Sequence, residues 1–559
     1  MEKNQEYTLE SIQNFKGKYP KQLWILFLVE MWERFTFYGM RALLGLYISH
    51  LILSINYKQA DSVKVNEVTA KYAKLGEVLD ENHPKYFIET STQESRNDAE
   101  SVSNKQYGLI NAFIYAMAFL GGMFADKIFG FRKSIFWGGT LMAIGTLLMA
   151  IPGAISFYIG ISILIVGNGF FKPNISTMVG SLYKDGDARR DTGFSLFYSG
   201  INIGAVLSGL TIAYIGTTYS WSLGFLISGI CMLLGLGLFI FTQKTLGPIG
   251  LPPFKDKLDK KVAGFKIEWI YFGLSLLLIP IFFVLVYFPI DLDLSFLFGN
   301  NIDGTPYTVQ LCDVIMISVG VITLIYLIYE IAKSTKEESK KLIVALILIL
   351  FSVLFWSFFE QGGGSLNFFA NGNVNSHGFN MTQVNNTING LWVVIFSPIV
   401  GILWLFMNRK NKEPNTVVKF GFGFVFLGLG FFLFFISKFY ADANGLTPMW
   451  MFCFAYLVIT LGELCLSPIG LSMITKLSPK RLFGVMMGTW FLASAFGQYG
   501  AGLIGAAIAQ PESGEKATNI TKLNAYCSGY EMVAYISIAS GLVLIAISPL
   551  LKKLMGGVK

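Results

Sequence analysis

Charged residues are scarce in this 559-residue sequence: Asp, Glu, Lys and Arg make up 14% of it, against about 25% in soluble domains. Hydrophobic residues make up 53%, and the mean hydropathy is +0.55. These values exclude an ordinary soluble domain and predict a chain that buries its surface in a lipid bilayer. The formal net charge of +8 is interpreted as a property of basic loops, so no nucleic-acid partner is expected.

Cysteine and histidine are also rare. The sequence has five cysteines and three histidines. Four of the cysteines lie in or at the edge of apolar runs, which is typical of small apolar fillers rather than of disulfides or metal ligands. We therefore expect no metal and no cofactor other than the proton, and proton chemistry inside the membrane must depend on carboxylates. An enzyme or a receptor is not expected, because no nucleophile motif or metal cluster is visible.

Apolar runs of about 20 residues, the length that crosses a bilayer, recur along nearly the whole sequence. Their number, about fourteen, predicts an all-α polytopic membrane protein. The approximate cores of these runs are 22–54, 105–129, 132–152, 155–183, 191–217, 219–243, 268–290, 308–332, 340–361, 385–408, 416–438, 447–477, 482–509 and 528–551.

The basic residues predict the topology, since Lys and Arg accumulate in short cytoplasmic loops. The intervals 190–244, 266–333 and 341–409 contain no Lys or Arg between their ends. Each interval holds two predicted spans and one outer turn, which predicts a multi-pass protein of the plasma (inner) membrane with both termini in the cytoplasm. Residues 1–21 are polar and lack the apolar segment of a cleavable signal peptide, so the first span is expected to anchor the chain.

The loop lengths group the spans as six, two and six. We expect an N-terminal six-helix bundle over residues 1–243, a linker with two extra helices over 244–336, and a C-terminal six-helix bundle over 337–559. A polar insertion at 55–104 is expected outside the membrane. Its composition favours disorder or a small surface subdomain over a binding module.

The first predicted helix carries charges where hydrocarbon should surround them. A stripe of about 100° on this helix holds Glu30, Arg34, Phe37, Tyr38 and Arg41. Glu33 lies just beside the stripe. A charge at the bilayer centre costs roughly 2.5 to 3.5 kcal/mol on insertion scales, so these groups are candidates for a solute pathway or a proton relay.

Four later spans also carry polar groups with two possible roles. Lys172, beside Pro173, needs a buried carboxylate partner such as Glu30 or Glu33, unless it snorkels to the interface. Asn202 can bind a ligand amine or tie two helices together. Without the family resemblance, the residues around it favour helix packing. Glu360, four residues after Trp356, and Glu463 lie in apolar runs. Either glutamate can serve a solvated cavity or a purely structural ion pair.

The loop after the second span contains Gly121, Gly122, Asp126 and Arg132. Its glycines permit close helix approach, and Asp126 can meet a helix N-terminus or a basic partner. This segment resembles the loop signature of the major facilitator superfamily, which implies a gating role for Asp126 and Arg132. The alternative is an ordinary charged turn.

Taken together, these motifs resemble the proton-dependent oligopeptide transporter family of the major facilitator superfamily. The resemblance covers essentially the entire chain, beginning at Phe15-Lys-Gly-Lys-Tyr-Pro and continuing through the first-helix acids and Gly39-Met-Arg41. It implies two six-helix bundles around a central cavity, with two extra helices between them. It also implies a proton-coupled symporter that imports di- and tripeptides by alternating access and functions as a monomer. The alternative is a major facilitator transporter of another small solute, such as an amino acid, a drug or nitrate.

The resemblance also assigns roles to single residues. The proton-coupling residues it implies are Glu30, Glu33, Arg34, Lys172 and Glu360, with Arg41 paired to Glu360. The peptide carboxylate is expected near Arg41 and Lys172, and the peptide amine near Asn202, Asn389 and Glu463. The aromatic residues it places along the cavity are Tyr38, Tyr115, Trp356 and Trp490. Phe37 departs from the family motif, which more often has tyrosine there, and this departure is expected to affect side-chain preference or affinity and leave coupling intact.

Overall fold

A computed structural model provides the structure of this chain. It describes all residues except 1–6, 58, 60–61, 75, 82, 185–186, 188, 253–257, 259, 263, 300–305, 511–517 and 557–559. Within helices it leaves out the side chains of residues 126, 127, 191, 297, 298, 468, 469, 471, 472, 475, 480, 483 and 484.

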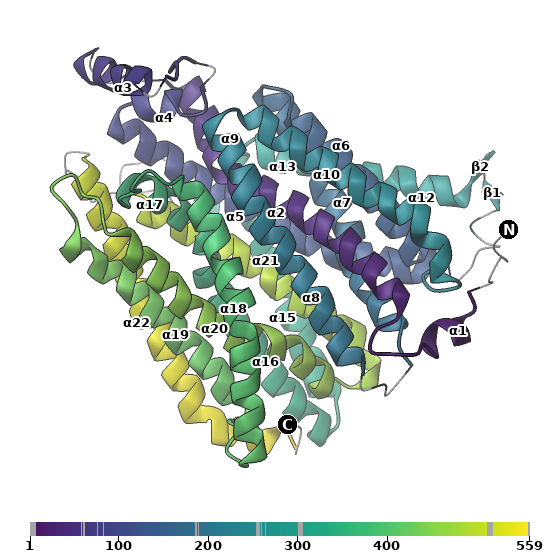
Figure 1. Ribbon diagram of the computed structural model, residues 1–559. Helices are drawn as coiled ribbons and strands as arrows, with labels where there is room; N and C mark the ends of the chain where they lie inside the picture. The colour runs from purple at the N-terminus through teal and green to yellow at the C-terminus, as the bar shows by residue number, and fades with distance from the viewer. Residues whose placement is uncertain are drawn as a thin grey trace.

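The first group of long helices forms one bundle, which we call the N half (Figure 1). Its longest helix, α2, has 35 residues and spans about 52 Å at 1.5 Å per residue, well beyond the roughly 30 Å of a hydrocarbon core. The helices of the N half are α2 (Lys21–Ile55), α5 (Gln93–Phe124), α6 (Phe131–Met149), α7 (Ala154–Ser181), α8 (Arg189–Ser208), η2 (Gly209–Ala213), α9 (Tyr214–Thr218) and α10 (Trp221–Thr242).

The second bundle, the C half, follows from residue 336. Its first helix ends at Phe359, and the chain continues as the 3-10 turn η4 because three successive glycines, residues 362–364, oppose an α-helix. Glu360 therefore lies at a helix break. The helices of the C half are α16 (Lys336–Phe359), η4 (Glu360–Gly363), α17 (Ser365–Asn373), α18 (Met381–Arg409), α19 (Thr416–Ile436), η5 (Ser437–Tyr440), α20 (Met449–Leu477), η6 (Lys480–Leu482), α21 (Phe483–Ile508) and α22 (Asn519–Leu554).

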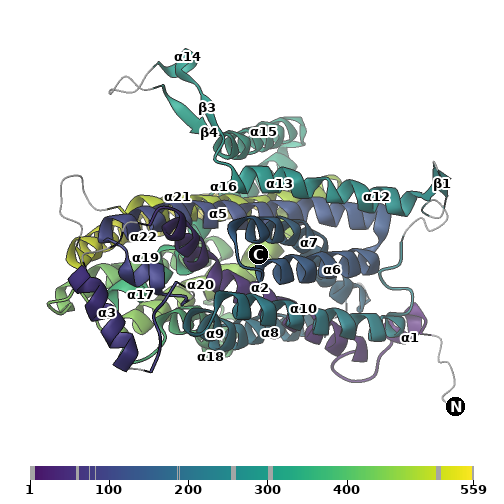
Figure 2. The same cartoon turned by 90° about the horizontal axis from the view of Figure 1, so that it is seen from above.

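Two extra membrane helices lie between the halves in the sequence and against one face of the bundle (Figure 2). The first is broken at Leu277 into α12 (Ile267–Leu276) and α13 (Leu278–Tyr287), because the ring of Pro280 opposes the carbonyl four residues before it. A short antiparallel hairpin, β3 (Asp291–Asp293) with β4 (Thr308–Gln310), projects from the bundle with α14 (Ser295–Phe298) at its tip. The second helix is α15 (Leu311–Lys333). The linker before them forms a second hairpin of β1 (Lys261–Val262) and β2 (Phe265–Lys266).

Thirteen segments of the described chain are long and apolar enough to cross a membrane. The fourteenth predicted span, 132–152, is present as α6, although α6 is not among the thirteen. This helix has 19 residues, and Arg132 and Lys133 in its first turn lower its mean hydropathy. The expected all-α polytopic fold is confirmed.

The polar insertion differs from its prediction at one end. Its first part forms α3 (Ser62–Lys74) and α4 (Tyr86–Thr90), in keeping with a small surface subdomain. Residues 93–104, however, are the first turns of α5, which Thr92 caps by accepting from the backbone N–H of Ser95 at 3.2 Å. Hydropathy located only the apolar part of this helix, because its first turns are polar.

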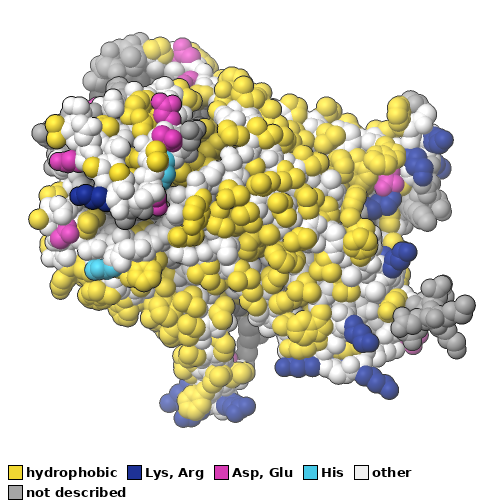
Figure 3. All heavy atoms as spheres, turned by 45° about the horizontal axis from the view of Figure 1, so that its top comes forward, with side chains coloured by type: hydrophobic (Ala, Val, Ile, Leu, Met, Phe, Trp, Pro, Cys, Tyr) yellow, Lys and Arg dark blue, Asp and Glu magenta, His cyan; other side chains and the backbone are white. Residues whose placement is uncertain are grey.

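The bundle has two distinct ends. Helices α3, α4 and α17 lie at one end, which we call the α3 end, while α1 (Leu9–Gln13) and both chain termini lie at the other, the α1 end (Figure 1). On the face that Figure 3 shows, apolar side chains cover much of the surface between the two ends, and Lys and Arg gather at its lower and right margins. Helices α8 and α18 diverge toward the α1 end (Figure 1).

Candidate substrate and proton site

Three charged side chains of α2 form one buried cluster. The Nε of Arg34 donates to Oε1 of Glu30 at 2.6 Å, and the same nitrogen lies 2.9 Å from Oε2 of Glu33. Both glutamates are fully buried. The i, i+4 spacing of Glu30 and Arg34 accounts for the first contact. One cation therefore serves two carboxylates, and the cluster is negative when both acids are ionised.

Asn168 of α7 completes the surroundings of Glu33. Its side-chain amide donates to Oε1 of Glu33 at 3.1 Å, and Asn168 is fully buried. Asn168 was not among the predicted site residues. Asn168 lies four residues before Lys172, on the same face of the helix, and this spacing could have identified it as a site residue.

Lys172 contacts an aromatic ring of α5. Its Nζ lies 3.7 Å from the centre of the Tyr115 ring, a cation–π contact. Among the described residues Lys172 forms no ion pair, so the expected pairing with Glu30 or Glu33 was wrong for this conformation. Arg34 contacts both acids and Asn168 donates to Glu33, whereas Oε2 of Glu30 has no hydrogen-bond partner among the described residues. The ammonium is thus held in the charged centre by an aromatic face, with no carboxylate partner.

Arg41 and Glu360 join the two halves. The Nη2 of Arg41 on α2 forms an ion pair with Oε2 of Glu360 in η4, and its Nε donates to the hydroxyl of Tyr107 on α5 at 2.5 Å. The side chains of Arg41 and Glu360 are 12% and 8% exposed. The contact that the family resemblance implied is therefore formed. Tyr107 was missed, because only the fold brings α5 beside Arg41.

Glu463 of α20 has a side-chain amide as its partner and, among the described residues, no cation. The side-chain amide of Asn389 on α18 donates to its Oε2 at 3.1 Å and to Oγ1 of Thr460 at 3.0 Å. Glu463 is 9% exposed and forms no ion pair with any residue of the described chain. The predicted neighbours Asn389 and Glu463 are thus in direct contact.

The remaining predicted residues surround this centre. Tyr38 lies within electrostatic range of Arg34, Arg41, Glu360 and Glu463. The amide of Asn202 donates to the carbonyl of Tyr198 in its own helix at 3.0 Å, so in this conformation it does not tie two helices together.

Two tryptophans contribute to the packing of the C half. Trp356 fits against Gly497 of α21, and its indole Nε1 is buried without a hydrogen-bond partner among the described residues. Trp490 is 7% exposed and packs against Gly470 of α20. Trp356 therefore offers a free donor, whereas Trp490 mainly fills the contact between α20 and α21.

The proposed gating residues lie at the α1 end. The backbone of Asp126 lies in η1 (Ala125–Phe129), but its side chain lies outside the described part of the chain. The guanidinium of Arg132 donates to the carbonyl of Ile249 at 2.7 Å and to the carbonyl of Gly247. Arg132 thus attaches the segment after α10 to the start of α6.

The charged groups form one network between the halves. Electrostatic interactions link four carboxylates and three cations, namely Glu30, Glu33, Glu360, Glu463, Arg34, Arg41 and Lys172. One negative charge is in excess when all are ionised. Ionisable groups inside membrane helices mark solute pathways and proton relays, and no group of three or more His, Cys, Asp or Glu among the described residues could hold a metal.

Two helical halves around a buried charged centre define a secondary transporter of the major facilitator fold. The sequence profile of the POT family matches residues 132–521. The chain belongs to the POT family and is a membrane transporter, not an enzyme.

Known proteins are similar to this chain along most or almost all of its length. The uncharacterized transporter YclF of Bacillus subtilis is 31% identical, with 97% of this chain and 96% of YclF covered. The peptide transporter YePEPT of Yersinia enterocolitica is also 31% identical, with 87% and 88% covered. A crystal structure of the peptide transporter POT in complex with sulfate is 27% identical, with a TM-score of 0.72 and 98% of this chain and 100% of that chain covered.

Proposed function

We propose that this protein imports di- and tripeptides together with protons by alternating access of its two halves. One observation carries the proposal: half-buried Lys172 in the N half and buried Glu463 in the C half form no ion pair with any described residue. A short peptide is a zwitterion with a carboxylate at one end and an ammonium at the other. It supplies the missing partner on each half at once.

These charges determine where each end of the peptide binds. The carboxylate binds near Lys172 and Arg41, and the amine binds Glu463 beside Asn389. Tyr38, Tyr115, Trp356 and Asn202 contact the backbone and side chains between the termini, and Trp490 supports the C-half wall. Arg34 and Arg41 are held by acids already, so Lys172 is the cation that remains available to the substrate.

Proton coupling follows from the charge balance of the network. A zwitterionic peptide adds no net charge, so the excess negative charge remains until one acid binds a proton. Glu30, Glu33 and Glu360, held by Arg34 and Arg41 beside Lys172, are the candidate proton carriers. Protonation of a paired acid releases its cation, which can then rearrange as the halves rock. One charge moved through 100 mV supplies about 2.3 kcal/mol, which drives accumulation of a neutral peptide.

We infer the orientation from the basic residues. Lys and Arg gather at the end that carries both termini, and this distribution supports a plasma (inner) membrane protein with that end in the cytoplasm. The α3 end then faces outward. We also propose residues 1–243, 244–336 and 337–559 as the N-terminal bundle, the linker with two extra helices, and the C-terminal bundle. The monomer is the proposed functional unit, with Asp126 and Arg132 in the inner gate.

The test uses purified protein in liposomes. Dialanine uptake is followed under an inward proton gradient with inside-negative potential, for wild type and Glu360→Gln. We expect accumulation in the wild type and its collapse in the variant, with passive counterflow retained. Absence of any dialanine movement by a monodisperse wild-type sample would refute the proposal.

Competition distinguishes the alternative, a transporter of another small solute. Labelled dialanine is challenged with excess free alanine, a cationic drug and nitrate. We expect competition by other di- and tripeptides only, because a single amino acid is too short to reach both halves. Displacement by nitrate or alanine at equal concentration would favour the alternative.

A further inference from the structure

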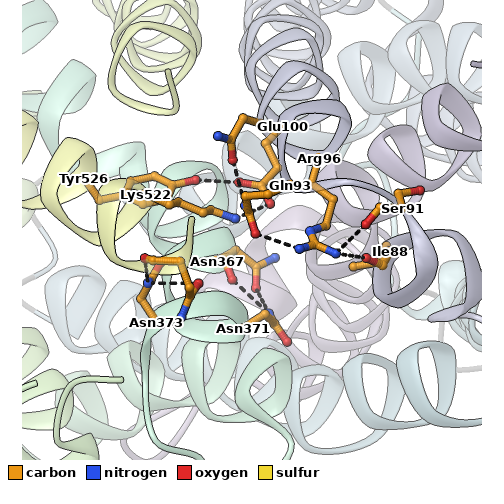
Figure 4. Close-up of polar contacts among 12 residues, drawn as sticks. Ile88, Ser91, Gln93, Arg96, Glu100, Asn367, Asn371, Asn373, Lys522 and Tyr526 are labelled. Carbon is orange, nitrogen blue, oxygen red and sulfur yellow. Dashed lines mark hydrogen bonds and ion pairs between the residues drawn. The ribbon is translucent and has the colours of Figure 1, made fainter. Parts of the chain in front are cut away.

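A second buried ion pair joins the halves near the α3 end (Figure 4). Nζ of Lys522 on α22 donates to Oε1 of Glu100 on α5 at 2.6 Å, and the hydroxyl of Tyr526 donates to Oε2 of the same carboxylate at 2.9 Å. The side chains of Lys522 and Glu100 are 4% and 8% exposed. Each oxygen of the N-half acid therefore has its own donor from the C half.

Arg96 does not compete for this acid. It lies one turn before Glu100, but its guanidinium donates to the carbonyls of Ile88 and Ser91 at 3.0 and 2.9 Å and to the side chain of Gln93 at 2.6 Å (Figure 4). Its donors are thus used within the N half. Lys522 is the cation that neutralises Glu100, and this contact crosses between the halves.

The Glu100–Lys522 pair lies closer to the α3 end than the central site does, and α5 contributes to both. Tyr107, which accepts from Arg41, follows Glu100 by seven residues, about 10 Å along α5. Between them α5 touches α21, since a Cβ on Gly505 would lie 3.0 Å from the side chain of Asn104. The ion pair is thus the outer part of a continuous contact between the halves.

A hollow of about 280 Å³ lies beside the pair and is lined from both halves. Glu100 and Trp221 contribute from the N half, and Asn371, Thr382 and Lys522 contribute from the C half. Water in this hollow can reach both charges once the helices separate. A buried pair is costly to break when one partner stays buried, but much less so when both charges become hydrated.

We propose that Glu100 and Lys522 form a latch that holds the α3 end closed and opens when the transporter opens to that side. Separation of α5 from α22 must break the pair, because the two residues belong to different halves. Tyr526 strengthens the latch by holding the second carboxylate oxygen. The proposal rests on the alternating access proposed above and is independent of the substrate.

The experiment measures the separation of the halves directly. Spin labels are placed at Glu94 and Ala443, which are exposed at the α3 end of the N and C halves, in a Cys453→Ser background, since the other four native cysteines are buried. Pulsed electron paramagnetic resonance then gives the ratio of long to short distances in liposomes without peptide or gradient. We expect Glu100→Gln and Lys522→Gln to raise this ratio at least fivefold. Tyr526→Phe should raise it less.

The charge swap Glu100→Lys with Lys522→Glu should return the ratio to within twofold of wild type. The matched control is Lys105→Gln, which breaks an ion pair from the same helix to Asp313 of α15 (3.2 Å) and not to the C half. It should leave the ratio within twofold.

An unchanged ratio in monodisperse Glu100→Gln protein, or a control shift as large as that of the latch variants, would overturn the proposal. So would a swap that fails to restore the ratio. If a single variant does not fold, the swap and Tyr526→Phe still decide. Failure of dialanine uptake would leave these distances interpretable, so failure of the transport proposal and failure of the latch are separable.

Discussion

The side-chain amide of Asn389 on α18 donates to Oε2 of Glu463 on α20 at 3.1 Å, and no cation of the described chain pairs with that carboxylate. The same amide reaches Oγ1 of Thr460, so its orientation is fixed from two sides. No cation of the described chain neutralises this acid, so the ammonium of a ligand can take that place. In the opposite half, Lys172 is held in the same way by the ring of Tyr115. We propose that the two residues form a divided site for the two ends of one short molecule.

The Glu463 side of this site is tested by removing its charge. Glu463→Gln should weaken dialanine binding roughly 10- to 100-fold, the range for one hydrogen bond to a charged group at about 1.5 to 3 kcal/mol. Binding of N-acetyl-dialanine, which lacks the ammonium, should be unchanged by the substitution. The measurement compares inhibition of labelled peptide uptake by the two compounds.

Glu268→Gln is the matched control for this variant. Glu268 of α12 pairs with Lys133 of α6 at 2.6 Å, outside the charged network. The Glu268→Gln variant should bind both compounds as the wild type does. If Glu463→Gln still prefers dialanine to the acetylated peptide by the wild-type factor, Glu463 does not bind the amine.

The Lys172 side predicts the complementary selectivity. Lys172→Gln should lose most of its affinity for dialanine, again by roughly 10- to 100-fold, and should lose its preference for dialanine over dialanine amide. Competition by the two compounds against a labelled peptide measures this preference. A variant that keeps the preference would show that another cation, such as Arg41, holds the carboxylate.

Much of the fold follows from the sequence, because apolar runs of membrane length locate helices wherever they lack polar turns. The start of α5 was placed twelve residues too late for that reason, since its first turns carry polar side chains that contact both halves. Glu30 and Arg34 lie one turn apart, so local geometry predicts their contact. The pairing of Lys172 could not be predicted, because it depends on whether Arg34 or Lys172 reaches the acids first. The contact of Glu100 with Lys522 joins residues 422 apart in the sequence and needs the packed fold.

Asn168 is predicted to act on Glu33 and not only on helix packing. Asn168→Leu leaves the buried Glu33 carboxylate without its amide donor, which should lower stability by about 1 to 3 kcal/mol. Glu33→Gln with Asn168→Leu should cost less than the two single changes together, with a coupling of roughly 0.5 to 3 kcal/mol. Thermal unfolding in detergent, followed by intrinsic fluorescence, supplies the four values of this cycle. Strict additivity would show that the 3.1 Å contact carries no energy.

Gly108 of α5 sets how closely the halves approach. A Cβ at this position would lie 2.5 Å from the Cα of Gly502 and 2.7 Å from the carbonyl oxygen of Gln498, both backbone atoms of α21 that cannot turn aside. Gly108→Ala should therefore force α5 and α21 apart and cost about 1 to 3 kcal/mol, as overpacking does. Gradient-driven dialanine uptake should fall with it, since the α3 end closes less often.

Gly237 of α10 provides the matched control, because a Cβ there meets nothing within 4 Å. Gly237→Ala should be neutral or stabilising by up to about 1 kcal/mol, since alanine favours a helix interior over glycine. Melting temperature and initial uptake rate are measured for both variants at equal protein density in the liposomes. Equal melting temperatures and equal uptake would mean that α5 and α21 have room to relax, and the close approach at Gly108 would then not limit closure.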